Sequence, residues 1–138
     1  MFKFLLSFFL LSTTSCVAQK MVQRIGDAKE LQLNEKQFIG KPLKVLLDQI
    51  EPQIKSAIGN PDSKSKETSP MIAFYFVDKN EFRYRKGRGE KPMHISVLLQ
   101  PAIDKSYPPL SGANPWTEEQ AKAYGDMIVT KLWISGKN

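Results

Sequence analysis

A short basic segment is the most conspicuous feature of the sequence that could do chemistry. Five cationic side chains fall within residues 83–91, and two aromatic residues and two glycines are interleaved with them. Such a cluster suits phosphate, an acidic polysaccharide or an anionic lipid head group. The alternative is a solvated helix face, which is the usual role of a run of charge. The cations are Arg83, Arg85, Lys86, Arg88 and Lys91, of which we take the three arginines as candidate ligand-binding residues.

The one histidine is a second candidate. His94 precedes Ser96 by two residues, so the two side chains would share one face of a strand. A histidine, a serine and a carboxylate can form an acyl-transfer site, so one hypothesis is a small hydrolase that uses His94. No Gly-x-Ser-x-Gly elbow marks Ser96 as a nucleophile, and a solvent-exposed histidine on a sheet face is the simpler interpretation. We therefore keep His94 as a candidate ligand-binding residue and assign no catalytic residue.

Aromatic residues in a proline-rich loop are a third candidate. Tyr107 precedes two prolines, and Trp116 follows an Asn-Pro pair. Exposed Tyr and Trp side chains are favoured at binding surfaces for sugars and peptides, so both residues are candidate ligand contacts. The alternative is that they pin a long loop onto the sheet, with Trp116 next to the start of a helix.

The sequence has no pattern typical of a metal or cofactor site. Cys16 is the only cysteine, so a zinc site would need carboxylates around a single histidine. Asp78 and Glu81 have the spacing of a helix N-cap, which explains them better than acid–base chemistry does. We expect neither a metal nor a cofactor.

Residues 1–18 have the order of a secretory signal peptide. A lysine precedes an apolar run from Phe4 to Leu11, which is shorter than the roughly 20 residues of a membrane-spanning helix. We favour cleavage after Ala18, which would leave Gln19 as the N-terminus. The alternative is lipidation of Cys16, which would tether the domain to a membrane. We therefore expect a periplasmic or secreted protein, or else a membrane-tethered lipoprotein.

The length and the net charge of the chain limit the number of domains and the kind of partner. Without residues 1–18, 120 of the 138 residues remain, which suffices for one domain with one core. Lys3 is the only charge in the removed part, so 19 basic and 14 acidic side chains remain and the net charge is +5. That charge is ordinary for a small domain and only mildly suggests an anionic partner. We expect an envelope protein or an anionic glycan as partner, no nucleic acid, and membrane contact only through an anchor at Cys16.

Periodicity and turn residues predict the elements that position these candidates. Apolar residues at helical spacing follow Pro42, and Pro52 should end that helix. Two apolar segments rich in β-branched and aromatic residues read as strands, and two capping patterns precede short helices. In chain order the prediction is a polar arm, either a tether or loosely docked (19–37), a helix (42–51), a strand or a kinked continuation of that helix (53–58), a turn (59–62), a polar stretch (63–70), a strand (71–77), a helix (79–86), a strand (93–100), a long connection (101–116), a helix (117–125) and a strand (126–134).

This order predicts a single α+β domain over residues 38–138. Short helices between neighbouring strands suit a small mixed or antiparallel sheet of three to four strands, with the helices packed mainly on one face. In residues 93–100 the apolar side chains alternate with His94, Ser96 and Gln100. This alternation predicts that one face of the sheet is turned toward solvent.

Three short segments resemble those of small, uncharacterised exported bacterial proteins. They are Phe38-Ile39-Gly40-Lys41-Pro42-Leu43, Gly59-Asn60-Pro61 and Tyr124-Gly125-Asp126-Met127-Ile128-Val129. The resemblance spans about one domain, from Phe38 to Ile134. It implies export, but it implies no activity and carries no functional residue across.

Three hypotheses of function follow. The first is a non-enzymatic envelope protein that binds a partner or ligand through its open sheet face or its aromatic loop. The second is an anion-binding module that uses the basic segment 83–91. The third is the hydrolase, which requires His94 to lie within hydrogen-bond reach of Ser96 or a carboxylate.

Overall fold

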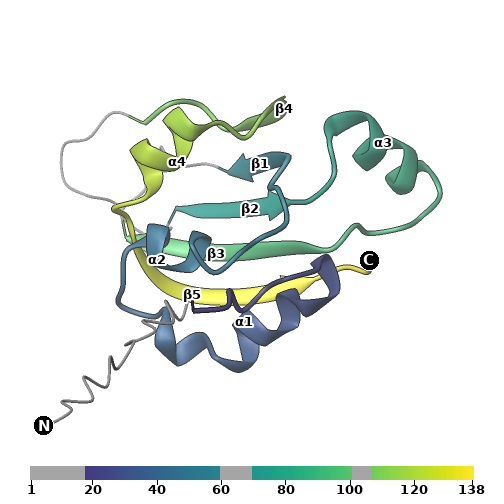
Figure 1. Ribbon diagram of the computed structural model, residues 1–138. Helices are drawn as coiled ribbons and strands as arrows, with labels where there is room; N and C mark the ends of the chain where they lie inside the picture. Colours follow the sequence, from purple (N-terminus) through teal and green to yellow (C-terminus); the bar gives the residue numbers. More distant parts are fainter. Residues whose placement is uncertain (1–17, 60–69, 101–106) are drawn as a thin grey trace, which may run out of the picture.

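The computed structural model describes residues 18–59, 70–100 and 107–138, apart from the side chains of residues 111–114. Within them the chain forms five strands, four α-helices and two short 3₁₀ helices (Figure 1). The helical elements are η1 (Ile25–Ala28), α1 (Lys29–Leu33), η2 (Glu35–Gln37), α2 (Leu43–Leu47), α3 (Lys79–Gly87) and α4 (Glu118–Tyr124). The strands are β1 (Ser56–Gly59), β2 (Met71–Tyr75), β3 (His94–Gln100), β4 (Ser111–Pro115) and β5 (Ile128–Ser135).

All five strands belong to one antiparallel sheet in the order β4-β1-β2-β3-β5. This arrangement confirms the predicted α+β class and selects the antiparallel sheet. The described strands exceed the predicted three to four because β4 lies inside the stretch 101–116, which was expected to be a connection. The β4 sequence Ser-Gly-Ala-Asn-Pro lacks the β-branched and aromatic residues that signal a strand. Its pairing with β1 makes it the edge of the sheet.

One face of the sheet carries the hydrophobic core. The register pairs Phe74 with Ile95 and Ile72 with Val97, and all four side chains are buried on this covered face. Leucines of α1 and α2 and Tyr124 of α4 pack against them. Burial of one such side chain is worth about 1.5–3 kcal/mol. The helices therefore lie mainly on one face, as predicted, while α3 stands beyond the end of the sheet and buries no residue (Figure 1).

The opposite face, the open face, is less exposed than the sequence suggested. His94 and Ser96 are only 6% and 3% exposed, so the prediction that both face solvent is wrong. The ring of Tyr75 stacks on His94, and Trp133 lies opposite Ser96 on β5. By register the open face comprises Ser56, Ile58, Met71, Ala73, Tyr75, His94, Ser96, Leu98, Gln100, Lys131, Trp133 and Ser135.

The N-terminal segment is part of the core, and its predicted loose docking is wrong. Val22, Ala28 and Leu31 have no exposed surface, and all three belong to the main hydrophobic cluster. Val22 also forms a parallel bridge with Ile50, with backbone hydrogen bonds of 2.9 Å to the carbonyl of Gln49 and from the amide of Glu51. With Ile25 these residues recur at every third position, but they are few and stand in a polar stretch, so the pattern is a weak signal of burial.

The same segment covers the outer edge of β5. The Gly40 amide donates to the Val129 carbonyl at 2.8 Å, and the Val129 amide donates to the Lys41 carbonyl at 2.9 Å. Farther along, the Ile134 amide donates to Oε1 of Gln32 at 2.8 Å. A bare edge strand offers its hydrogen-bonding groups to other chains, so this cover protects the sheet from edge-to-edge association.

The first predicted helix exists but is shorter than expected. Pro42 has ψ 143° and precedes α2 as its N-cap instead of being its first helical residue. The helix ends at Leu47 because Ile50 leaves the helical path to bridge with Val22. The ambiguous segment 53–58 is resolved as extended chain that enters β1 at Ser56, so the kinked helix is wrong.

Local capping signals were read correctly. Oδ1 of Asp78 accepts hydrogen bonds of 2.9 Å from the amides of Asn80 and Glu81, as an N-cap should. Thr117 and Gln120 form a reciprocal capping box at the start of α4, with distances of 3.2 and 3.0 Å.

Some predictions fall outside the described residues. These are the signal peptide through residue 17 with Cys16, the turn beyond Gly59 and most of the polar stretch 63–70. Among the helices of the described residues, none has both the length and the apolar character needed to cross a membrane.

Candidate anion-binding site

Two adjoining cavities open where α3 leads into β3. The first, of about 340 Å³, is lined by Tyr75, Phe82, Lys86 and residues 89–92. The second, of about 540 Å³, is lined by Arg85, residues 89–91 and residues 136–138. Residues 89–91 form a wall of both cavities, so we treat the two as one site, the α3–β3 cleft.

A glycine turn at the end of α3 shapes the common wall. Gly89 has φ +74°, and its amide donates to the carbonyl of Lys86 at 3.0 Å. The next amide, of Glu90, donates to the carbonyl of Arg85 at 3.0 Å. This pair of bonds is a Schellman motif, which requires a left-handed residue and therefore favours glycine. The turn reverses the chain and brings Lys91 back beside the helix.

A second glycine brings the C-terminal residues to the cleft. Gly136 has φ +87°, and a Cβ there would lie 2.2 Å from the carbonyl oxygen of Pro92. Only glycine can therefore let the chain pass so close to the start of β3. The Lys137 amide donates to the Lys91 carbonyl at 2.8 Å, and the Met93 amide donates to the Lys137 carbonyl at 2.9 Å. The backbone thus holds Lys137 beside Lys91.

Aromatic rings line the inner side of the cleft. Phe82 of α3 meets Tyr75 edge-on at 5.1 Å between ring centroids, and His94 stacks on the other side of Tyr75 at 4.7 Å. Burial raises the pKa of the Tyr75 hydroxyl above its ordinary value of 10.0. This hydroxyl stays protonated at neutral pH, so it can donate a hydrogen bond to an anion.

Three lysines supply the positive charge of the cleft. Lys86 and Lys91 line the smaller cavity, and Lys91 and Lys137 line the larger one. None of the three forms an ion pair with any residue that the structure describes. Their ammonium groups are therefore available to an external anion.

The arginines of the basic segment are mostly engaged within the segment itself. Arg85 binds Oε1 of Glu81 at 2.7 Å, one helical turn earlier, and Arg88 binds Oε1 of Glu90 at 3.1 Å. Arg88 also lies 5.6 Å over the ring of Tyr84 and donates to its hydroxyl at 3.1 Å. These contacts pair Glu81, next to the cleft, and Glu90, in its wall, with arginines, and they leave the lysines without an ion-pair partner among the described residues.

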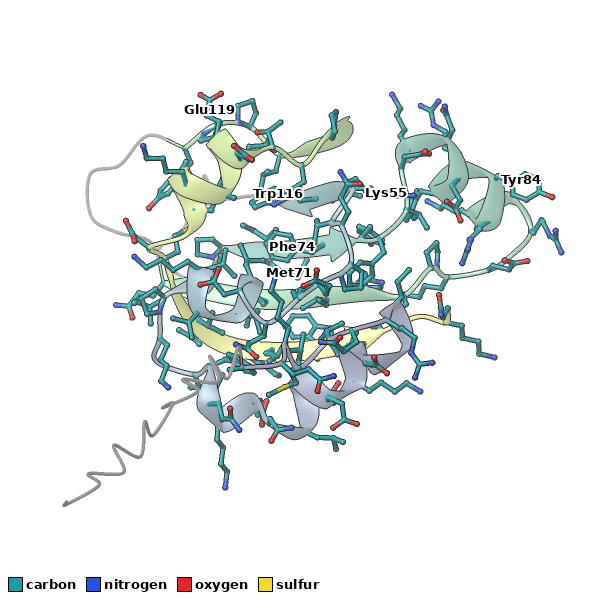
Figure 2. All side chains as sticks on the ribbon, in the orientation of Figure 1. Lys55, Met71, Phe74, Tyr84, Trp116 and Glu119 are labelled. Atoms are coloured by element: carbon teal, nitrogen blue, oxygen red, sulfur yellow. The ribbon has the colours of Figure 1, made fainter. Side chains whose placement is uncertain are left out.

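Of the predicted arginines, only Arg85 lines the cleft. Arg83 and Arg88 are exposed and line neither cavity. Tyr84, which is 65% exposed, points away from the sheet on the far side of α3 (Figure 2). The basic segment is therefore split into a solvated outer side and an inner side that contributes Arg85 and Lys86 to the lining of the cleft.

The hydrolase requirement is not met at His94. The ring nitrogen Nδ1 lies 2.9 Å from the carbonyl oxygen of Pro92, so Nδ1 carries the proton and donates it there. Among the described residues the ring has no hydrogen bond to Ser96 or to a carboxylate. Burial, and to a smaller extent the charge of Lys91, lower the pKa of His94, although its bond to Pro92 opposes this. The ring supports Tyr75 instead of forming a catalytic pair.

The aromatic loop packs into the core. Trp116 meets Phe74 edge-on at 5.1 Å on the covered face (Figure 2), and Tyr107 stacks on Tyr124 at 5.1 Å. Both are partly buried against the main hydrophobic cluster, as the pinning interpretation predicts. Trp116 and Tyr107 lie on the other face of the sheet from His94, so the predicted candidates do not converge on one pocket.

Sequence reasoning missed half of the cleft. It did not single out Tyr75, Phe82 or Lys137 as site residues. Tyr75 ends a buried strand and reaches the cleft through the β2–β3 pairing. Lys137 follows Lys91 by 46 positions and reaches the cleft through its bridge with Pro92, beyond the end of the β3–β5 pairing. The one available signal for this contact was the prediction of strands at residues 93–100 and 126–134, which could pair with each other.

The donor chemistry of the site points to anions. Among the described residues, no three His, Cys, Asp or Glu side chains are grouped so that they could hold a metal ion.

Comparison with protein-family models, with curated proteins and with solved structures found no match to this chain.

Proposed function

We propose that this protein is a non-enzymatic binding domain that holds an anionic ligand in the α3–β3 cleft. The observation that carries the proposal is the pairing of uncompensated lysines with an aromatic surface. Lys86 and Lys91 line a cavity of about 340 Å³ together with Tyr75 and Phe82. Cations that lack an internal partner bind an external anion without first breaking an ion pair.

The ligand class follows from the lining groups. Ammonium groups bind phosphate, sulfate or carboxylate as point charges, and a neutral tyrosine adds one oriented donor. An aromatic wall favours a ligand with an apolar or ring face next to its charge. An acidic glycan and a phosphorylated head group both have this chemistry.

Retention on immobilised heparin tests the proposal. The variant Lys86→Ala/Lys91→Ala should bind roughly tenfold more weakly than the unmodified chain, because two exposed charges contribute about 0.7 kcal/mol each. The matched control is Lys29→Ala/Lys36→Ala, which removes the same charge from exposed positions of α1 and η2. If the two variants lose retention equally, the effect reflects net charge and the cleft is not the site.

We also propose that the protein is exported. The order of residues 1–18 supports this, as does the resemblance of three segments to exported bacterial proteins. Among the residues that the structure describes, Met21 and Val22 are the first that belong to the core or pack against it, and both lie beyond Ala18. Mass spectrometry of the protein from its native host should find Gln19, or an acylated Cys16, at the N-terminus. An intact Met1 would contradict export.

A further inference from the structure

The open face of the sheet continues directly from the cleft. Tyr75 lines the smaller cavity and is also the last open-face residue of β2, at the end of the strand next to the cleft. From there the strand presents Ala73 and then Met71 to the same side. At about 3.3 Å per residue this row extends roughly 13 Å from the aromatic wall of the cleft.

Apolar side chains border this row. Ile58 of β1 pairs with Ala73, and Leu98 of β3 pairs with Met71. Ile58 is 39% exposed and Met71 is 43% exposed, although β1 and β2 are interior strands of the sheet; Ile58 lies near the end of β1 and Met71 begins β2. Ala73 between them is buried, whereas Leu98 and Trp133 are half-buried. We define the apolar strip as Ile58, Met71, Ala73, Leu98 and Trp133, with buried Ser96 between Ala73 and Trp133.

Positive charge accompanies the apolar strip. Nζ of Lys131 lies 5.8 Å from the centroid of the Trp133 ring, and Lys86 and Lys91 stand at the cleft end. No Asp or Glu is among the open-face residues. In the cleft the lining carboxylate side chain is Glu90, which is paired with Arg88. A surface that combines apolar side chains, a tryptophan and lysines in excess of carboxylates is complementary to the interface of an anionic membrane.

We propose that the open face and the cleft together dock on a lipid membrane that carries anionic head groups. One head group occupies the cleft, while Ile58, Met71 and Trp133 enter the interfacial region. This inference rests on the proposed anion-binding function and names the source of the anion. It also adds a membrane contact that does not depend on an anchor at Cys16.

The shape of the strip favours a membrane over a single soluble amphiphile. Ligand pockets enclose most of a small ligand, whereas the strip belongs to one exposed sheet face, where an acyl chain would keep one side in water. A lipid surface covers the whole strip at once and leaves no such exposed side.

Co-sedimentation with vesicles tests the inference. All proteins carry Cys16→Ser, so that no acyl chain contributes. The parent should bind vesicles of phosphatidylcholine and phosphatidylglycerol in equal parts, and should bind pure phosphatidylcholine much more weakly. The variant Ile58→Asp/Met71→Asp should bind these vesicles at least about tenfold more weakly than the parent, because the two apolar side chains are no longer available for burial in the membrane. The control is Leu33→Asp, since Leu33 is 77% exposed on α1, away from the open face, and this variant should bind like the parent.

Comparison of heparin retention with vesicle binding distinguishes a failure of membrane docking from a failure of anion binding. Retention of Ile58→Asp/Met71→Asp on heparin shows that the fold and the cleft are intact. A blue shift of tryptophan fluorescence on vesicle addition should disappear in Trp133→Phe. Heparin binding by a parent that ignores both vesicle types would overturn membrane docking and leave anion binding standing. Equal loss in the Leu33→Asp control would also overturn docking, whereas absence of heparin retention would remove the proposed function itself.

Discussion

At the scale of single residues, the cleft is defined by which charges are already satisfied. Glutamates one turn away or two positions along engage Arg85 and Arg88, whereas Lys86, Lys91 and Lys137 have no such partner among the described residues. A count of basic residues in the sequence therefore overestimates the arginines and underestimates the lysines. The chemistry of the site depends on the lysines.

His94 provides a prediction about pH. Its folded-state pKa lies below the ordinary value of 6.5, because burial and Lys91 disfavour the charged ring. The unfolded chain therefore binds a proton at a higher pH than the folded protein does. The free energy of unfolding contributed by neutral His94 should be fully present above about pH 6.5 and should fall as the pH drops below it.

Urea denaturation between about pH 7.5 and about pH 5.5 measures this effect, because histidine is the side chain that titrates there. The unmodified protein should lose stability across this range, and His94→Gln should lose less. The hydroxyl of Tyr75, which stacks on the ring, has a pKa above its ordinary value of 10.0 and stays neutral throughout this range. Parallel curves for the two proteins would show that His94 does not titrate in this way.

At the scale of elements, the turn after α3 determines whether the cleft exists. The helix itself buries no residue, so its capping by Asp78 and its Schellman turn at Gly89 hold it in place. Both signals are local, and the sequence predicted the helix from them. The path of the chain after the turn depends on pairing with residues 136–137, which no local signal indicates.

The two glycines near this turn should respond in opposite directions to alanine. Gly89→Ala should destabilise the protein by about 1–2 kcal/mol, because φ +74° is strained for any residue with a Cβ. Gly87→Ala should be neutral or stabilising by about 0.5 kcal/mol, because Gly87 is helical and nothing lies within 4 Å of its Cβ position. Thermal unfolding of both variants is the check. Similar losses in both would show that Gly89 is not confined to the left-handed conformation.

The N-terminal segment supplies another matched pair. Leu31 and Leu33 lie on the same short helix, but Leu31 is fully buried and Leu33 is 77% exposed. Leu31→Ala should cost about 2–5 kcal/mol, because it opens a cavity in the core. Leu33→Ala should change stability by less than about 0.5 kcal/mol. Denaturant titration of both variants compares them, and a small effect of Leu31→Ala would restore the interpretation of a loosely docked arm.

At the scale of the whole molecule, the parts with strong local signals were predictable. The apolar strands β2 and β3 and the capped helices α3 and α4 follow from periodicity and cap residues. The core role of Val22, Ala28 and Leu31 was not predicted, because a short row of apolar residues at every third position in a polar stretch is a weak signal. Strand β4 was not predicted either, because its residues have low strand propensity. The position of Lys137 in the cleft was also not predicted. These features depend on contacts between distant parts of the chain, which a single sequence does not display.

The central claim is that an anion binds at the junction of α3, β3 and the C-terminal residues. The most direct measurement is an NMR titration of the ¹⁵N-labelled protein with a heparin-derived oligosaccharide, which reports the site residue by residue. The largest amide shifts should fall on Gly89, Glu90, Lys91 and Lys137, with little change in α1 and α4. Shifts centred on α1 or α4, or spread evenly over all exposed lysines, would contradict the account.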